Sequence, residues 1–118
     1  MKHLILAIAL ILPLSVGAYD PDHLTLLKET NECPKCDLSG ANLKGANLKG
    51  ANLWYAKLMG ADLNGANLEG ANLYGADLEW ANLEWANLQG ANTDYATMKG
   101  AILCNTTMPD GTKDNSGC

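Results

Sequence analysis

The sequence contains no phenylalanine and no arginine, and aromatic residues make up only 6% of its 118 residues. Eight lysines against thirteen acidic residues give a formal net charge of -5. This balance argues against a nucleic-acid partner, which would require a basic stripe on the protein. The longest apolar run, Leu4 to Leu12, is too short for a comfortable membrane span. The composition therefore indicates one small unit.

The first eighteen residues have the features of a secretory signal peptide. Lys2 and His3 precede the apolar run, and Val16-Gly17-Ala18 supplies the small residues of a cleavage site before Tyr19. An uncleaved anchor is the alternative. We expect a mature chain of residues 19–118 that is periplasmic or secreted and has no stable membrane span after cleavage. Its seven lysines and thirteen acids give a formal charge of 7 − 13 = −6.

From residue 36 to residue 110 the chain repeats every five residues. The repeat reads Ala, then Asn or Asp, then Leu, then a variable residue, then most often Gly, as in Ala41-Asn42-Leu43-Lys44-Gly45. Five residues advance an α-helix by about 500°, so the leucines would not form one face of a helix. On a straight strand an odd spacing sends successive leucines to opposite faces. Both Ala and Leu point inward only if the chain turns a corner once per repeat, which predicts a β-solenoid with coils about 4.8 Å apart.

These repeats resemble the pentapeptide-repeat family, whose motif is A(D/N)LXX. The resemblance covers about two thirds of the chain and implies an all-β solenoid, a right-handed quadrilateral parallel β-helix with four repeats per coil. Leu and the preceding Ala would line the interior. The departures lie at the ends, where other residues replace Ala or Leu: Cys36, Thr93, Met98, Thr106 and Met108.

Coils of twenty residues predict four interior columns. They consist of Leu38, Leu58, Leu78 and Met98; of Leu43, Leu63, Leu83 and Leu103; of Leu48, Leu68, Leu88 and Met108; and of Leu53, Leu73 and Thr93.

Two further features of the repeat predict local structure. Stacked amides are expected to form hydrogen-bond ladders from coil to coil, as at Asn47, Asn67 and Asn87. Glycine suits a corner with positive φ, so the corners that carry an aromatic residue instead are expected to use another turn type. Those corners are at Tyr55, Trp80, Trp85 and Tyr95.

Four cysteines lie in two pairs near the two ends of the repeats. Three pairings are possible, but the ends should be about 15 to 20 Å apart if each coil rises about 4.8 Å. A disulfide needs Cα atoms within about 7 Å. We therefore predict the bonds Cys33–Cys36 and Cys104–Cys118. The same distance excludes a single four-cysteine zinc site, and no metal or other cofactor is expected.

The repeats are expected to be capped at both ends. Residues 19–35 would form an N-terminal helical cap that begins at Asp20-Pro21-Asp22 and ends in the CxxC segment. Leu24 and Leu27, with Leu26 beside them, would face the first coil, and His23 would be solvated. Residues 36–110 would form the β-helix, and residues 111–118 a C-terminal capping tail.

Outward positions are the candidates for function. Six exposed aromatic residues form the candidate binding face, since such patches often mark partner sites; cross-coil stacking is the alternative explanation. They are Trp54, Tyr55, Tyr74, Trp80, Trp85 and Tyr95. Trp54 and Tyr74 are expected to be neighbours one coil apart. Glu79 and Glu84 would lie on successive sides of a convex tower with no cleft for catalysis, and Lys44 and Lys49 would be solvated.

The leading hypothesis is a non-enzymatic exported binding or scaffold module of the cell envelope, with a protein or glycan as its partner. Family resemblance supplies one alternative, an acidic DNA mimic that binds DNA gyrase and confers quinolone resistance. The leader, the short tower and the absence of an obvious C-terminal dimerisation helix count against it. A thiol-disulfide redox protein, based on Cys33 and Cys36, is the other alternative. The oligomeric state stays open.

Overall fold

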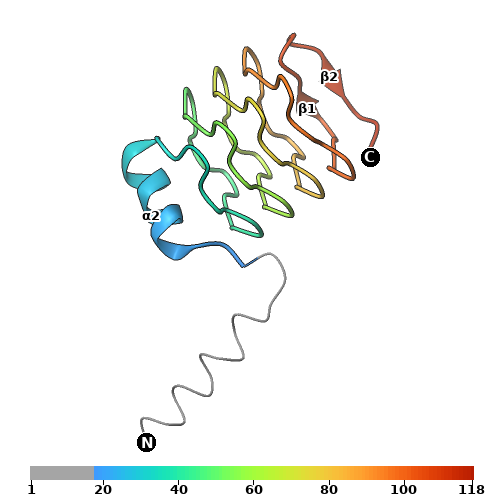
Figure 1. Ribbon diagram of the computed structural model, residues 1–118. Coiled ribbons are helices and arrows are strands. Elements are labelled where there is room, and N and C mark those ends of the chain that lie inside the picture. The colour runs from blue at the N-terminus through green and yellow to red at the C-terminus, as the bar shows by residue number, and fades with distance from the viewer. Residues whose placement is uncertain (1–17) are drawn as a thin grey trace, which may run out of the picture.

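The structure is a computed structural model that describes residues 18–118. The predicted signal peptide is residues 1–18, and all of it except Ala18 lies outside the described residues. The helix α2 (Pro21–Thr30) leads into a stack of coils, which ends in two short strands, β1 (Thr106–Thr107) and β2 (Lys113–Asp114). Figure 1 shows α2 at one end of this stack and the two strands at the other. Within residues 18–118 no helix combines the length and the hydrophobicity needed to cross a membrane.

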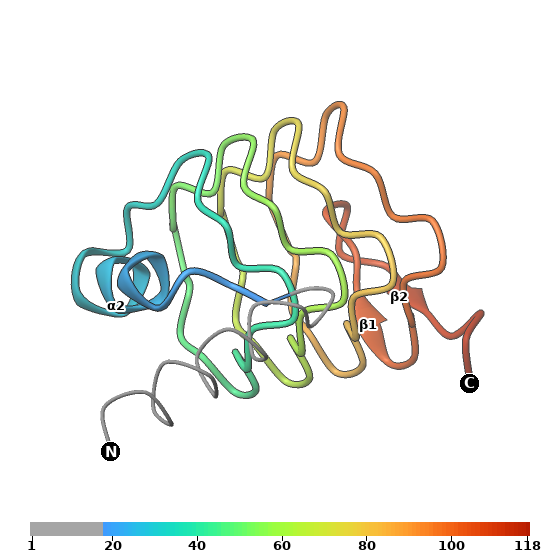
Figure 2. The same ribbon diagram turned by 60° about the horizontal axis from the view of Figure 1, so that its bottom comes forward.

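The coils lie side by side and pair through short parallel bridges. Asn47 pairs with Asn67, Asn67 pairs with Asn87, and every other isolated bridge also joins residues twenty positions apart. Bridges recur every five residues, so each coil has four sides, whose stacking can be followed in Figure 2. Each side is too short to count as a regular strand. Pairing begins at Glu32, which bridges to Asn52, so the first coil starts within the segment assigned by sequence to the cap.

The interior consists of leucine and alanine, as the repeat predicts. Every leucine at the central repeat position from Leu38 to Leu88 is at most 2% exposed. Burying one such side chain contributes roughly 1.5 to 3 kcal/mol to stability. The last coil differs, because Thr93, Met98 and Leu103 are only half-buried. No further coil stacks on them, so their columns end partly open.

The corners give the first correction to the sequence-based expectations. The corner glycines have φ between 65° and 73°, and the aromatic residues at equivalent corners have φ of 52° to 62°. The expected change of turn type at Tyr55, Trp80, Trp85 and Tyr95 is therefore wrong. The left-handed conformation costs a non-glycine residue roughly 1–2 kcal/mol. Tyr55 adopts it because its N–H donates to the carbonyl of Tyr74 at 2.8 Å, as corner glycines donate to the next coil.

The Asn and Asp residues give the second correction. Their Oδ1 atoms accept the backbone N–H two residues later, and a side-chain bond between coils occurs at Asp77, whose Oδ1 also accepts from Thr97 Oγ1 at 3.3 Å. Asn47 accepts from Lys49 at 3.3 Å, and Asn87 accepts from Gln89 at 2.9 Å. Asn67 behaves in the same way. These side chains are architectural, as expected, but they stabilise the turn that follows them and form no amide ladder.

Helix α2 begins where the sequence indicates. The N-cap residue Asp20 accepts the N–H of Asp22 at 2.9 Å, and Pro21 occupies the first helical position. Leu27 is fully buried against the first coil, and Leu24 is half-buried. Leu26 is 43% exposed, contrary to expectation, because a residue one position before Leu27 lies on a different face of the helix.

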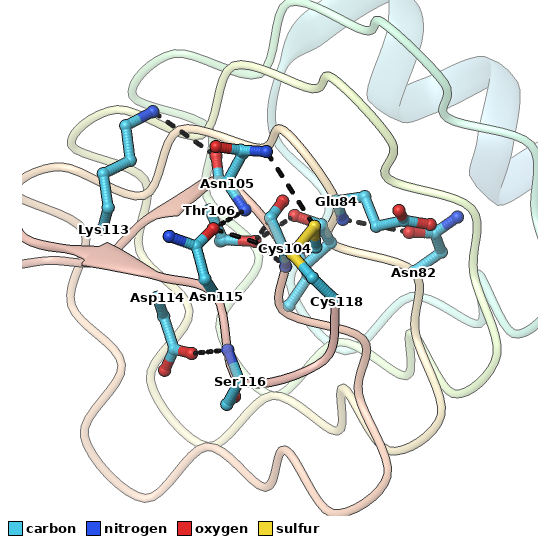
Figure 3. The surroundings of a disulfide bond; sticks show 11 residues. Asn82, Glu84, Cys104, Asn105, Thr106, Lys113, Asp114, Asn115, Ser116 and Cys118 are labelled. Carbon is cyan, nitrogen blue, oxygen red and sulfur yellow. Dashed lines mark hydrogen bonds between the residues drawn. A yellow bond between two sulfur atoms is a disulfide. The ribbon is translucent and has the colours of Figure 1, made fainter.

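The C-terminal tail folds back onto the last coil. Strand β2 pairs antiparallel with β1, and the Gly117 N–H donates to the Leu103 carbonyl at 2.7 Å. Figure 3 shows the disulfide Cys104–Cys118 that closes this hairpin. Its surroundings are held by Thr106, whose Oγ1 donates to the Leu83 carbonyl at 2.7 Å. Thr106 replaces the usual alanine and is fully buried, but this bond satisfies its hydroxyl.

Candidate binding surfaces

The six candidate aromatic residues separate into two groups in the structure. Four of them form a continuous column along one corner of the tower, which we call the aromatic ladder: Trp54, Tyr55, Tyr74 and Tyr95. The ring centroids lie 4.5 Å apart for Trp54–Tyr55, 5.8 Å for Tyr55–Tyr74 and 5.3 Å for Tyr74–Tyr95, each pair in an edge-on arrangement. Such pairs contribute about 0.5 to 1.5 kcal/mol beyond the area they bury.

The ladder also differs in detail from the expected pairing. Tyr55, rather than Trp54, is the ring that contacts Tyr74 across the coils. The ammonium group of Lys35 lies 5.2 Å from the centroid of Trp54, which extends the column to the first coil. Gly75 has no Cβ, and the Tyr55 ring occupies the space where one would be. The ladder is thus largely accounted for by contacts within the chain.

The other two aromatic residues form what we call the tryptophan edge. Trp80 and Trp85 occupy successive corners of one coil, and each is 61% exposed. The Trp80 ring covers Gly100 of the next coil, where a Cβ would collide with it. Neither tryptophan stacks on another aromatic ring within residues 18–118. The tryptophan edge is therefore the exposed part of the predicted face that has no aromatic contacts within residues 18–118; Tyr95 is more exposed, at 79%, but its ring packs against Tyr74 in the ladder.

The CxxC segment is part of the tower. The disulfide Cys33–Cys36 joins the central position of one repeat to the first position of the next, with Cα atoms 5.4 Å apart. Cys33 is fully buried and Cys36 is 4% exposed. Reactive cysteines sit in partly exposed sites, often at a helix N-terminus, whereas this pair is covered at the start of a solenoid. The geometry favours a structural disulfide, which was the expected pairing.

His23 has a structural role that the sequence did not indicate. Its Nδ1 accepts the backbone N–H of Asp37 at 2.9 Å, and its Nε2 lies 3.4 Å from Asp20 Oδ2. The expectation that His23 is simply solvated is therefore wrong: it attaches α2 to one side of the first coil. Within residues 18–118 no group of three or more His, Cys, Asp or Glu side chains is arranged to hold a metal ion.

Sequence reasoning missed a groove between α2 and the first coil. It has a volume of about 300 Å³, and its walls include Lys28 from α2 and Lys44 from the first coil. The sequence predicts that Lys44 is solvated, and it contains no pattern that indicates a groove beside Lys28. Glu79 and Glu84 lie elsewhere, each next to a tryptophan of the tryptophan edge.

Comparison with known proteins places the repeats in a family. A profile for pentapeptide repeats matches eight copies, over residues 35–65, 60–90 and 81–110. The chain belongs to the pentapeptide-repeat family. A search of curated proteins returned no match.

Solved pentapeptide-repeat structures resemble this chain. One from the thylakoid lumen of Arabidopsis thaliana is 30% identical, with a TM-score of 0.66, over 86% of this chain and 68% of its own. HetL, a pentapeptide repeat protein involved in heterocyst differentiation regulation in the cyanobacterium Nostoc sp. strain PCC 7120, is 39% identical. That match has a TM-score of 0.43 and covers 64% of this chain and 40% of HetL. The chain thus spans less than half of HetL's length.

Proposed function

We propose that this pentapeptide-repeat protein is a non-enzymatic binding or scaffold module of the cell envelope, built on a right-handed four-sided β-helix. It would engage a protein or glycan through the tryptophan edge. One observation carries this proposal: Trp80 and Trp85 are each 61% exposed at corners where the repeat normally has glycine. Holding a side chain at positive φ costs roughly 1–2 kcal/mol. Most of each ring nevertheless faces solvent, as expected of rings that a partner covers.

The proposed location has its own support. Residues 1–18 read as a signal peptide, and both cysteine pairs are disulfides, which persist in oxidising compartments such as the periplasm. Expression of the full chain with its leader, followed by mass determination of the recovered protein, tests this. We expect an N-terminus at Tyr19 and two intact disulfides. A cytoplasmic, uncleaved and reduced protein would contradict it.

The binding role is tested by a double substitution on the tryptophan edge. Trp80→Ser with Trp85→Ser should remove a partner that the wild-type mature protein retains from a native envelope fraction after crosslinking. Tyr95→Ser is the control, because Tyr95 is 79% exposed but belongs to the aromatic ladder. Retention of the same partners by the double variant, with an unchanged fold by circular dichroism, would contradict the proposal.

The same protein separates the two alternatives. Inhibition of DNA gyrase supercoiling by the mature protein would support the acidic DNA mimic. A Cys33–Cys36 bond that is reduced readily in the folded protein would support a redox protein, whereas the burial of both sulfur positions predicts slow reduction.

A further inference from the structure

The N-terminal end of the tower has an open strand edge on two of its four sides. In later coils the second residue of each repeat donates its N–H to a carbonyl of the preceding coil, as Asn52 does to Asn31 at 2.9 Å. The same spacing would place residues 21 and 26 opposite Asn42 and Asn47, but these residues belong to α2. The N–H groups of Asn42 and Asn47 consequently have no acceptor within residues 18–118.

Helix α2 seals the other part of this end. Both backbone groups of Asp37 have hydrogen-bond partners: its carbonyl accepts the Asp20 N–H at 3.0 Å, and its N–H donates to His23 Nδ1. The Glu32 N–H is also satisfied, because it donates to Thr30 Oγ1 at the end of α2 at 3.1 Å. Figures 1 and 2 show α2 lying across this end of the stack. The open edge therefore lies beside the helix rather than under it, where the groove is found.

The groove is lined by hydrogen-bond donors and by apolar side chains. Leu27, Leu43 and Leu48 are among its lining residues, and no acidic side chain of residues 18–118 lines it. Lys28 and Lys44 contribute ammonium groups. The Oδ1 atoms of Asn42 and Asn47 already accept the N–H groups of Lys44 and Lys49, so their Nδ2 groups remain as donors. The local charge is opposite in sign to that of the mature chain.

We propose that this groove binds an extended acidic segment of a partner protein as an added strand. The segment's backbone would pair with Asn42 on one side of the tower, turn the corner as the coil does and pair with Asn47 on the next side, and its carboxylates would meet Lys28 and Lys44. Pairing of this kind supplies affinity through main-chain bonds and selectivity through alternate side chains. A volume of about 300 Å³ admits a few residues of an extended chain, not a folded domain.

Charge decides between this occupant and a second copy of the chain. Two mature chains each carry a formal charge of 7 − 13 = −6, so their net charges repel one another. An acidic segment that is short and extended meets mainly the local lysines. The site is separate from the tryptophan edge, so this proposal stands or fails independently of the proposed function.

A peptide titration tests the charge requirement. The probe is a fluorescein-labelled peptide, acetyl-Glu-Val-Asp-Val-Glu-amide, added to the disulfide-intact mature protein, with binding measured by fluorescence anisotropy at low salt. Lys28→Gln with Lys44→Gln should weaken binding at least about tenfold. Lys57→Gln with Lys99→Gln removes the same charge away from the groove and should change Kd less than about threefold. Equal weakening by the two double variants, equal binding of the neutral peptide acetyl-Gln-Val-Asn-Val-Gln-amide, or no binding would overturn the proposal.

A backbone test addresses the added strand. Asn42→Pro removes an N–H that donates to no backbone acceptor within residues 18–118, so no backbone hydrogen bond is lost. Proline is tolerated at an open edge. Asn42→Ala is its control, since both variants lose the Asn42 Oδ1 bond to Lys44. We expect the proline variant to bind at least about tenfold more weakly than the alanine variant. Equal binding by two folded variants would overturn the strand geometry.

If the proline variant does not fold, amide hydrogen exchange of the wild-type protein tests the strand pairing instead. Saturating peptide should slow exchange of the Asn42 and Asn47 amides, which the free protein leaves open. Binding without such protection would contradict the proposal. Light scattering that shows a dimer dissociated by Lys28→Gln with Lys44→Gln would identify a second copy as the occupant and would also overturn it.

Discussion

Replacement of a central leucine tests the architecture most directly. Leu68 lies in the middle of the column formed by Leu48, Leu68 and Leu88, and its exposed fraction is 0%. The coils on either side are held by backbone bonds, Leu48 N–H to the Asn67 carbonyl and Leu68 N–H to the Asn87 carbonyl, both at 2.7 Å. The site therefore cannot collapse around a smaller side chain, and Leu68→Ala leaves most of its cavity open.

The magnitude follows from that rigidity. Leu→Ala in a closed core costs about 2.7 to 5.0 kcal/mol, with the larger values at sites that relax least. We expect Leu68→Ala to lower the free energy of unfolding by about 4 kcal/mol. Since 1 kcal/mol shifts Tm by roughly 4–8 °C in a domain of this size, Tm should fall by roughly 15–30 °C. Leu103→Ala, in the half-buried last coil, should cost about 1–2 kcal/mol.

Guanidinium unfolding of the mature protein, followed by circular dichroism, measures these changes. Leu26→Ala is the control, because Leu26 is 43% exposed and should lie within about 0.5 kcal/mol of wild type. An unchanged dependence of the free energy on denaturant would show that the loss is one of stability, not of cooperativity. If Leu68→Ala cost no more than Leu26→Ala, the leucines would not fill a closed interior, and the architecture would be refuted.

Three further predictions concern the corners and the C-terminal cap. Gly45→Ala, at φ 67° with open space around it, should lower the free energy of unfolding by about 1–2 kcal/mol. Gly75→Ala, at the same φ, should lower it further because the Tyr55 ring must move. Equal losses of Tm in the two variants would contradict this. Replacing Cys104 and Cys118 by Ser should cost about 3 kcal/mol, the value for a loop of this length, and an unchanged denaturation midpoint would contradict it. Hydrogen bonds from Thr112 to Asp110 and from Ser116 to Asp114 lower the pKa of each carboxyl below 3.8, so their stabilisation is present above that pH and is lost as pH falls through the folded pKa. The protection factor of the Gly117 amide, which is its exchange rate corrected for the intrinsic pH dependence, should therefore fall below pH about 4, and Asp110→Asn with Asp114→Asn should abolish that fall.

The sequence determined the repeat geometry because the spacing of Ala and Leu has few physical solutions. Only a chain that turns every five residues buries both, so the columns from Leu38 to Leu88 and the twenty-residue coil followed directly. The local cysteine pairing followed from the height of the tower, and the start of α2 followed from Asp20 and Pro21. These features depend on local pattern and chain length alone.

The tertiary structure decided what depends on neighbouring coils. Propensity disfavours positive φ at Trp80 and Trp85, but the bonds that their N–H groups donate to carbonyls of the next coil impose it. Periodicity showed that the aromatic residues face outward; only the packing of side chains separated the stacked aromatic ladder from the exposed tryptophan edge. The groove arose because residues 21–30 form a helix instead of another half-coil, which leaves the Asn42 and Asn47 edge open. An edge is open only where no other segment covers it, and that is a property of the folded chain.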